Sequence, residues 1–529
     1  MITKKLLALA GAAALTATLA ACGGGGDESG SGSGESWILG TTDKVTSLDP
    51  AGAYDLGSWT LMFNMYQRLL TIPPGENQPA GDAAEECDYE DPKTFKCTLK
   101  DGLTFANGNE LTSSDVKYSL ERNIKIADPN GAASMLGSIM NKKDKVDPDA
   151  IETPDDSTII FHLNRPDTTF QYVLTTNAAA IVDEDTFPEN KLIGDEDAVG
   201  SGPFKMEQYK DGQQAVLVAN DEYNGANEAE SGKVFVQYFQ EPSGLKQAIS
   251  GGEVDVAWRS LSPTDVTDLE DNDSVKVYQG DGSEIRYWVW QLDTDAGGEK
   301  AIRQASANIL DREEIAKNAY SGIVEPLYSI VPPGLAGHKA SFKDKWGAEP
   351  DVDEAKKLLD DAGVDTPVDL TIGYTPSHYG PNMVDEANEV KRELEDSGLF
   401  KVKVKSAEWT QYQDLYKENA YDMFALGWFP DFLDADNYLT PFLVDGGFYQ
   451  NNYDSDKANK LINEELSTTD TDARNKVLGQ VQDLAAEDVP LVPSWVGKNI
   501  AIASPEMKGV EETLGAEFIF RMWSVTKEG

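Results

Sequence analysis

The second half of the chain alternates between helix-like and strand-like segments, and this alternation restricts the possible fold more than any other feature. Strand patterns occur at 287–292, 368–374, 401–405 and 421–426. Helix patterns separate them at 301–320, 353–361, 383–396 and 411–418. Helix followed by strand, repeated, is typical of an α/β architecture. With two further helices near 455–466 and 473–487, we predict an α/β lobe over residues 285–496.

The rest of the mature chain is expected to form a second lobe and an inserted subdomain. At 529 residues the chain is longer than a single compact core usually spans. We assign 37–75, 191–284 and 497–529 to one discontinuous α/β lobe, with a helix over 54–70. Residues 76–190 read as an inserted α+β subdomain, in which a helix opens at Thr112 with Asp115 three residues later.

A short segment after the strand at 421–426, Gly427 to Leu439, combines aromatic residues, a proline and three aspartates. Because Phe429 precedes Pro430, the backbone is pushed out of the helical region, and Asp431 lies in an irregular loop beside aromatic surface. A carboxylate that loses water there needs a cation or several N–H donors. The alternative is a turn aspartate that caps the next helix. The loop alone leaves both readings open, and the family resemblance described below assigns ligand binding to Asp431 and capping to Asp434 and Asp436.

The N-terminus has the features of an export signal. Residues 1–22 begin with Lys4 and Lys5, continue with an uncharged apolar run and end in Leu19-Ala20-Ala21-Cys22, which resembles a bacterial lipobox. Residues 23–36 contain glycine, serine and acidic residues, as expected of a flexible tether. We therefore expect a signal peptide, lipidation at Cys22 and attachment to the outer face of a membrane. An ordinary signal peptide with an incidental cysteine is the alternative.

The other two cysteines and the net charge restrict cofactors and partners. Cys87 and Cys97 flank a turn followed by a strand, so in an exported protein they are expected to form a disulfide across a hairpin. With three histidines and no Cys–His spacing typical of zinc, we expect neither a metal nor a cofactor. A formal charge of −47 argues against nucleic acid as a partner.

Several separated motifs point to one family. They are Leu48-Asp49-Pro50, Asn64 to Leu70, Leu99 to Phe105 with Asn107-Gly108, Leu111 to Leu120, Gly200 to Phe204 with Ala219 to Tyr223, Gly251 to Asp255, Arg303-Gln304-Ala305 with Asp311-Arg312, and Gly427 to Leu439. In this order and over nearly the whole mature chain, they resemble the solute-binding lipoproteins of peptide-type ABC importers, bacterial extracellular solute-binding protein family 5.

This resemblance implies a fold and a function. The fold would be a type II periplasmic-binding-protein clamshell: two α/β lobes with an inserted third subdomain, joined by hinge strands near 280–286 and 493–500, closing over a ligand. The ligand would be an oligopeptide, delivered by a monomeric receptor to permease subunits in the membrane. In the family, the aspartate at the position of Asp431 pairs with the peptide's ammonium, and main-chain groups of Gly427 and Phe429 are plausible partners of its backbone.

Other candidate ligand-binding residues are less specific. Dipeptide-binding relatives carry an arginine for the peptide's carboxylate, shortly after the strand corresponding to 368–374. Here the segment Thr375 to Gly380 contains no arginine. A protonated His378 could bind that carboxylate weakly in place of the arginine. The alternative is a turn histidine that contacts neither the ligand nor the other lobe. The missing arginine argues against a strict dipeptide binder. Aromatic candidates for the cleft, with core packing as the alternative for each, are Trp428, Tyr287, Trp288 and Tyr54. Because side chains alternate along a strand, at most one of Tyr287 and Trp288 is expected in the cleft.

Three other functions remain open from the sequence. The same receptor role could serve a non-peptide solute, such as an oligosaccharide or a metal chelate, or a signalling peptide. An enzyme is disfavoured because the chain has no Gly-x-Ser-x-Gly or His-Glu-x-x-His motif. A glycosidase-like carboxylate pair, Asp431 with Asp434 or Asp436, is the remaining enzymatic reading.

Overall fold

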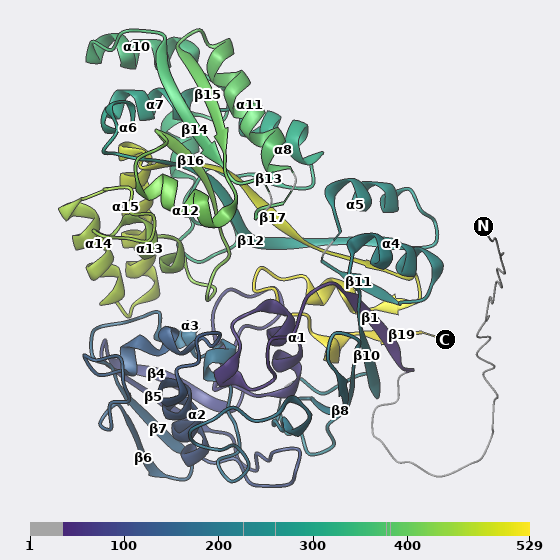
Figure 1. Cartoon of the computed structure of the whole chain (residues 1–529). Helices are drawn as coiled ribbons and strands as arrows, with labels where there is room; N and C mark the ends of the chain where they lie inside the picture. Colours follow the sequence, from purple (N-terminus) through teal and green to yellow (C-terminus); the bar gives the residue numbers. More distant parts are fainter. Residues whose placement is uncertain (1–34, 226, 260, 377, 381, 529) are drawn as a thin grey trace, which may run out of the picture.

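One mixed β-sheet runs through both halves of the molecule (Figure 1). The computed structural model describes residues 35–225, 227–259, 261–376, 378–380 and 382–528, so the predicted signal peptide, Cys22 and nearly all of the tether lie outside the described residues. The sheet has the strand order β15-β14-β16-β12-β17-β11-β1-β10-β9-β8, and β13 pairs with β17. The predicted α/β class is confirmed.

We call the half built on β1 and β8–β11 the first lobe. Its strands are β1 Trp37–Thr41, β8 Phe204–Lys210, β9 Gln214–Ala219, β10 Lys233–Tyr238 and β11 Val256–Trp258. Its helices are α1 Leu56–Met65, α4 Pro242–Gly251 and α5 Pro263–Glu270, with the short turns η1 Pro50–Gly52 and η4 Asp195–Asp197. The end of the chain returns to this lobe as β18 Met507–Lys508, η6 Val510–Thr513, η7 Met522–Ser524 and β19 Thr526–Lys527. Residues from β1, β8–β11, α1, β18, η6 and η7 share one apolar core, and α4 and α5 contribute to a second, smaller one.

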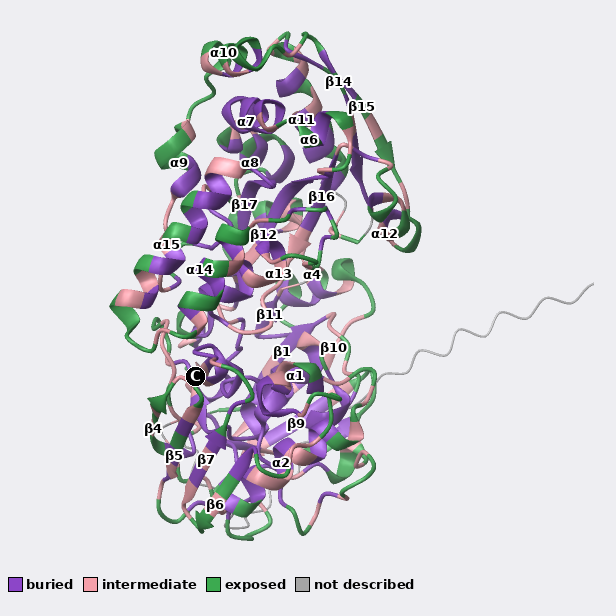
Figure 2. Ribbon diagram, turned by 90° about the vertical axis from the view of Figure 1, so that its left-hand side faces the viewer, coloured by how far each residue is buried: buried purple, intermediate pink, exposed green. Residues whose placement is uncertain are grey.

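The half built on β14–β16 is the second lobe. Its strands are β13 Glu325–Pro326, β14 Val368–Tyr374, β15 Phe400–Ser406 and β16 Met423–Trp428. Its helices are α6 Asp295–Gly298, α7 Lys300–Ile309, α8 Arg312–Tyr320, α9 Ser341–Trp346, α10 Val352–Ala362, α11 Met383–Asp396, α12 Trp409–Lys417, η5 Ala435–Tyr438, α13 Thr440–Leu443, α14 Asp456–Leu466 and α15 Thr471–Asp488. Two apolar cores fill this lobe. Buried residues concentrate inside the lobes, and outlying helices such as α10 expose much of their surface (Figure 2).

The inserted subdomain is built on a separate four-stranded sheet of order β4-β5-β7-β6. Its elements, with the neighbouring hairpin, are β2 Leu70–Thr71, β3 Ala80–Gly81, β4 Ala84–Asp91, β5 Thr94–Leu99, α2 Ser113–Ile126, η2 Ala133–Ile139, β6 Ile151–Asp155, β7 Thr158–His162, α3 Phe170–Val173 and η3 Asn177–Ala179. The predicted capping box is confirmed at α2, where the Thr112 backbone N–H donates to the Asp115 carboxylate over 2.9 Å.

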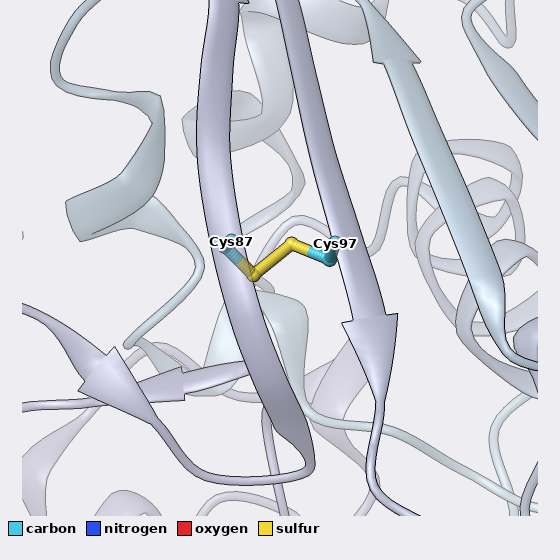
Figure 3. The surroundings of a disulfide bond; sticks show 2 residues. All are labelled: Cys87 and Cys97. Atoms are coloured by element: carbon cyan, nitrogen blue, oxygen red, sulfur yellow. A yellow bond between two sulfur atoms is a disulfide. The ribbon is translucent and has the colours of Figure 1, made fainter.

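A disulfide joins Cys87 and Cys97 on two neighbouring strands of this subdomain (Figure 3). The two cysteines are directly opposite each other in the antiparallel pair β4–β5. Cys97 is fully buried in the subdomain's apolar core, so the bond fastens the outer strand β4 to that core.

Replacing both cysteines with serine is expected to lower the free energy of unfolding of the subdomain by about 2–3 kcal/mol, because a closed loop is lost from the unfolded state. Urea titration of the wild type with and without reductant checks this. The reduced wild type should match the double variant, and an unchanged unfolding midpoint in both would contradict the expectation.

Two long strands connect the lobes. β12 Lys276–Trp290 runs from the first lobe into the second, and its antiparallel partner β17 Leu491–Ala503 runs back (Figure 1). Their pairing register shifts between Asp281 and Ile285 and again between Arg286 and Tyr287. Such irregularities bend a strand pair locally. The bend lies where the hinge is predicted, near 280–286.

Two predicted helices differ from the structure. The helix expected over 54–70 is only Leu56–Met65, because the chain turns extended at Tyr66 and enters β2. The helix expected over 301–320 is divided into α7 and α8. The division has a local cause: the Asp311 side chain accepts the Glu314 backbone N–H and starts a new helix.

Candidate functional site

The loop after β16 is held in place by one amide side chain. Asn437, in η5, accepts the Asp431 backbone N–H over 2.9 Å and the Trp428 indole N–H over 3.0 Å at the same oxygen. Its amide nitrogen donates to the Asp431 carboxylate over 3.4 Å. Asn437 therefore fixes both the backbone and the side chain of Asp431. Our sequence reasoning did not identify it, although it lies within the same short segment.

Asp431 has neutral partners. Besides Asn437, its carboxylate accepts the hydroxyl of Tyr54, a residue of the first lobe. Burial raises the pKa of Asp431, and the Asn437 amide offsets only part of that effect. None of the ion pairs formed among the described residues includes Asp431. A carboxylate that is partly desolvated and has no cationic partner would be stabilised by binding a cation.

Asp431 lines a cavity of about 280 Å³ between the lobes, which we call the acidic cavity. Its charged lining residues are Asp55, Asp431 and Glu517, and no lysine or arginine is among the described residues that line it. Much of the remaining wall is aromatic, from Tyr54, Trp59, Phe63, Phe429 and Phe432. The structure thus brings Tyr54, Phe429 and Asp431 together.

Trp428 and Gly427 lie next to this cavity without lining it. The Trp428 ring packs against Phe442 and Phe448, with ring centroids 5.2 and 5.5 Å apart. Gly427 is opposite Arg286 in the β12–β16 pair. A Cβ atom on Gly427 would lie 2.3 Å from a terminal nitrogen of Arg286, so the absence of a side chain admits that guanidinium.

Tyr287 and Trp288 are not cleft residues; for both candidates the core-packing alternative is the one that the structure shows. They point to opposite faces of β12, as alternation requires, but both faces are buried, and the two side chains are 1% and 0% exposed. Tyr287 packs against Phe442 and Tyr449. The Trp288 indole N–H donates to Glu386 over 3.0 Å. The physical reason is that β12 is a central strand whose two faces belong to different cores.

His378 stacks on Trp409, with ring centroids 3.8 Å apart and an interplanar angle of 4°. Partial burial and the positive charge of Arg286 lower its pKa. A lowered pKa disfavours the protonated imidazole that a carboxylate would need. His378 is also absent from the residues that line the cavities between the lobes.

The two later aspartates of the loop have structural roles. Asp434 caps η5, as predicted, by accepting the Asp436 backbone N–H. Its carboxylate also accepts hydrogen bonds from both terminal nitrogens of Arg474, each over 2.7 Å. The Arg474 Nε donates to the Glu465 carboxylate over 2.8 Å.

The capping role predicted for Asp436 is wrong. Asp436 is buried inside η5, where it accepts the Thr440 hydroxyl. Burial raises its pKa to about 6. Neither Asp434 nor Asp436 lines the acidic cavity, so the structure does not assemble a carboxylate pair with Asp431.

No helix between residues 35 and 528, outside the four masked positions, is long and apolar enough to cross a membrane. Over the same residues there is no group of three or more histidine, cysteine or acidic side chains that could hold a metal ion.

The sequence and the fold are similar to those of known solute-binding proteins. The family model described as "Bacterial extracellular solute-binding proteins, family 5 Middle" matches residues 78–450. The chain is 26% identical over 506 residues to the probable D,D-dipeptide-binding periplasmic protein DdpA of Escherichia coli (strain K12), covering 93% of this chain and 94% of that protein. It is 25% identical over 502 residues to the oligopeptide-binding protein OppA of Bacillus subtilis (strain 168), covering 90% of each. The unliganded open form of the periplasmic murein tripeptide-binding protein MppA superposes with a TM-score of 0.81 at 19% identity, covering 94% of this chain and 98% of that one. The predicted clamshell fold is confirmed.

Proposed function

Since the chain belongs to the bacterial extracellular solute-binding proteins of family 5, substrate-binding proteins of ABC importers, we propose that it captures oligopeptides between its lobes and delivers them to membrane permease subunits. One observation carries the proposal: Asp431 faces a cavity between the lobes, is partly desolvated and has no cationic partner among the described residues.

A peptide supplies the missing cation at its N-terminus. Its ammonium group would displace the Tyr54 hydroxyl and form charge-assisted hydrogen bonds with the Asp431 carboxylate, which are stronger than bonds between neutral groups. Because Tyr54 and Asp431 come from different lobes, a ligand bound there would touch both lobes at once. Such a contact favours the closed clamshell.

Main-chain groups near Phe429 would pair with the peptide backbone, as in strand addition. The receptor would act as a monomer without catalysing a reaction. It would be held at the outer face of the cell membrane by lipid on Cys22. A segment of small and polar residues after Cys22 supports a tethered body.

Native mass spectrometry of the protein purified from its own host tests the proposed ligand. We expect additional masses that correspond to a mixture of peptides, which dissociate on unfolding. One defined non-peptide mass, such as an oligosaccharide or a metal chelate, would overturn the peptide assignment. One defined peptide sequence would support a signalling receptor over nutritional uptake.

A further inference from the structure

The inserted subdomain is fixed to the first lobe by two buried ion pairs. Arg122 of α2 donates to both oxygens of the Asp49 carboxylate, just before η1, over 2.8 and 2.6 Å. Arg68, just before β2, pairs with Asp82 of the subdomain over 3.4 Å. All four side chains are at most 3% exposed. Because removing one partner of such a pair leaves a buried charge uncompensated, the pairs hold the subdomain and the first lobe together as one body.

Thr168 of the subdomain contacts the second lobe at the C-terminal end of α14. Its backbone N–H donates to the Leu466 carbonyl over 3.1 Å, and its hydroxyl donates to the Glu465 carbonyl over 3.2 Å. Thr168 is 2% exposed, so little water reaches these bonds. The last carbonyls of a helix have no partner within the helix itself, and here the other half of the molecule supplies donors to two of them. We call these two hydrogen bonds the latch contact.

Other groups cross the same boundary between the subdomain and the second lobe. The Asn77 side chain donates to the Gly334 carbonyl of the second lobe over 2.8 Å. Tyr172 of α3 is 2% exposed and belongs to an apolar core of the second lobe. Phe432 packs against that core and also against the core of the subdomain. The subdomain therefore meets the second lobe through polar and apolar contacts together.

Buried polar contacts join the latch contact to the loop that carries Asp431. The Glu465 carboxylate accepts the Arg474 Nε–H, and the Arg474 terminal nitrogens donate to Asp434. Asp434 caps η5, and Asn437 of η5 accepts the Asp431 backbone N–H. The part of the second lobe that Thr168 contacts and the loop that faces the acidic cavity are thus held in one arrangement.

The latch contact lies away from the strands that join the lobes. In Figure 1, α14 lies above the subdomain at the left of the molecule, whereas β12 and β17 cross between the lobes nearer its centre. Rotation about β12 and β17 separates groups in proportion to their distance from these strands. Opening of the clamshell therefore breaks the latch contact, and its donors and acceptors exchange their partners for water.

We propose that the inserted subdomain is a latch: by binding the end of α14 through Thr168, it holds the clamshell closed and slows the release of ligand. The contact consists of protein groups only, so it favours the closed form whatever the ligand is. The inference rests on the proposed function in one respect, namely that the ligand leaves from between the lobes.

Two substitutions, alone and combined, weaken the latch. Thr168→Val keeps the shape of the side chain and the backbone N–H but removes the hydroxyl. The Glu465 carbonyl still accepts the Thr468 N–H over 3.0 Å, so the substitution leaves no carbonyl unpaired. Asn77→Ala removes the second hydrogen bond between the subdomain and the second lobe. Because Asn77 lies outside the subdomain's core, this variant keeps the test valid if Thr168→Val disturbs folding.

Stopped-flow fluorescence measures the release of penta-alanine, because Trp59 lines the acidic cavity. We expect Thr168→Val to release the peptide about 2- to 10-fold faster than the wild type, as follows from losing one hydrogen bond of the closed form. The double variant should multiply the effects of the two single variants. Thr104→Val is the matched control. It loses a hydroxyl bond of 2.9 Å to the Glu222 carbonyl, which joins the subdomain to the first lobe, and should release the peptide at the wild-type rate.

Small-angle X-ray scattering of the peptide-free proteins gives a readout that needs no ligand. The double variant should have a larger radius of gyration than the wild type, because more of its molecules are open. Thr104→Val should have the radius of the wild type.

The two readouts separate failure of the latch from failure of the proposed function. Unchanged release and unchanged scattering in the double variant would overturn the latch and leave peptide capture standing. Equal acceleration of release in Thr104→Val would also overturn it, because the subdomain would then be loosened in general. If penta-alanine binds none of the proteins but the double variant still expands, the latch stands and the peptide assignment fails. No binding together with unchanged scattering would overturn both.

Discussion

Asp431→Asn is expected to weaken peptide binding by about 30-fold or more, corresponding to the 2–5 kcal/mol typical of truncating one partner of a desolvated charge pair. Asparagine keeps the shape and the hydrogen bonds to Tyr54 and Asn437 available, so the loss reports on charge. Calorimetry with unblocked peptides measures it. Unchanged affinity in this variant would defeat the ammonium role.

Two control variants accompany this experiment. Tyr54→Phe removes the hydroxyl that Asp431 accepts and leaves the carboxylate, so affinity should stay the same or rise. Asp361→Asn removes an equivalent charge from α10, at the far end of the second lobe, and should have no effect (Figure 1).

The same interaction predicts a pH dependence. Burial raises the pKa of Asp431 in the free protein, whereas a bound ammonium group favours the ionised form. Affinity should therefore fall as the pH drops through the raised pKa, by up to tenfold per pH unit, with a proton released on binding. It should also fall above about pH 8, where the peptide's amine loses its proton. Asp431→Asn should lack the acidic limb.

Arg474→Met is expected to cause the largest loss of stability, about 3–5 kcal/mol in the free energy of unfolding. Arg474 is 7% exposed and pairs with Asp434 and Glu465, both at most 3% exposed. Removing its charge leaves these carboxylates buried without a cation, and Asp436 lies beside them. Because the group anchors η5, the loop carrying Asp431 should loosen at the same time. Urea titration and peptide calorimetry measure the two effects.

The pH dependence distinguishes this cause from lost packing. Burial raises the pKa of Asp436 to about 6 and that of Glu465 well above its ordinary value. A raised folded-state pKa gives stability that is present at low pH and lost as the pH rises through it. The deficit of Arg474→Met should therefore shrink between pH 7.5 and pH 5. Lys356→Met, which breaks an exposed pair with Asp360, should cost about 1 kcal/mol or less. Equal losses in both variants would contradict the assignment.

Local patterns were sufficient for much of the fold. The capping box at Thr112, the disulfide positions in a hairpin and the Asp434 cap each involve residues close in the chain, so short-range signals predict them. The division at Asp311 is also local, but an uninterrupted helical pattern concealed it.

The candidate site also combines features set by neighbouring residues with features set by contacts between distant ones. The chain itself identified Asp431 as a carboxylate held in an irregular aromatic loop, because Pro430 and its neighbours act on adjacent backbone. Only the tertiary structure decided that Tyr54 meets Asp431 and that Tyr287 and Trp288 are both buried. It also brought Arg259, which follows β11, and Arg286 of β12 to one cavity. These outcomes depend on contacts between residues far apart in sequence: alternation along a strand states which side chains share a face, but what covers each face is set by sheet order and by packing between the lobes.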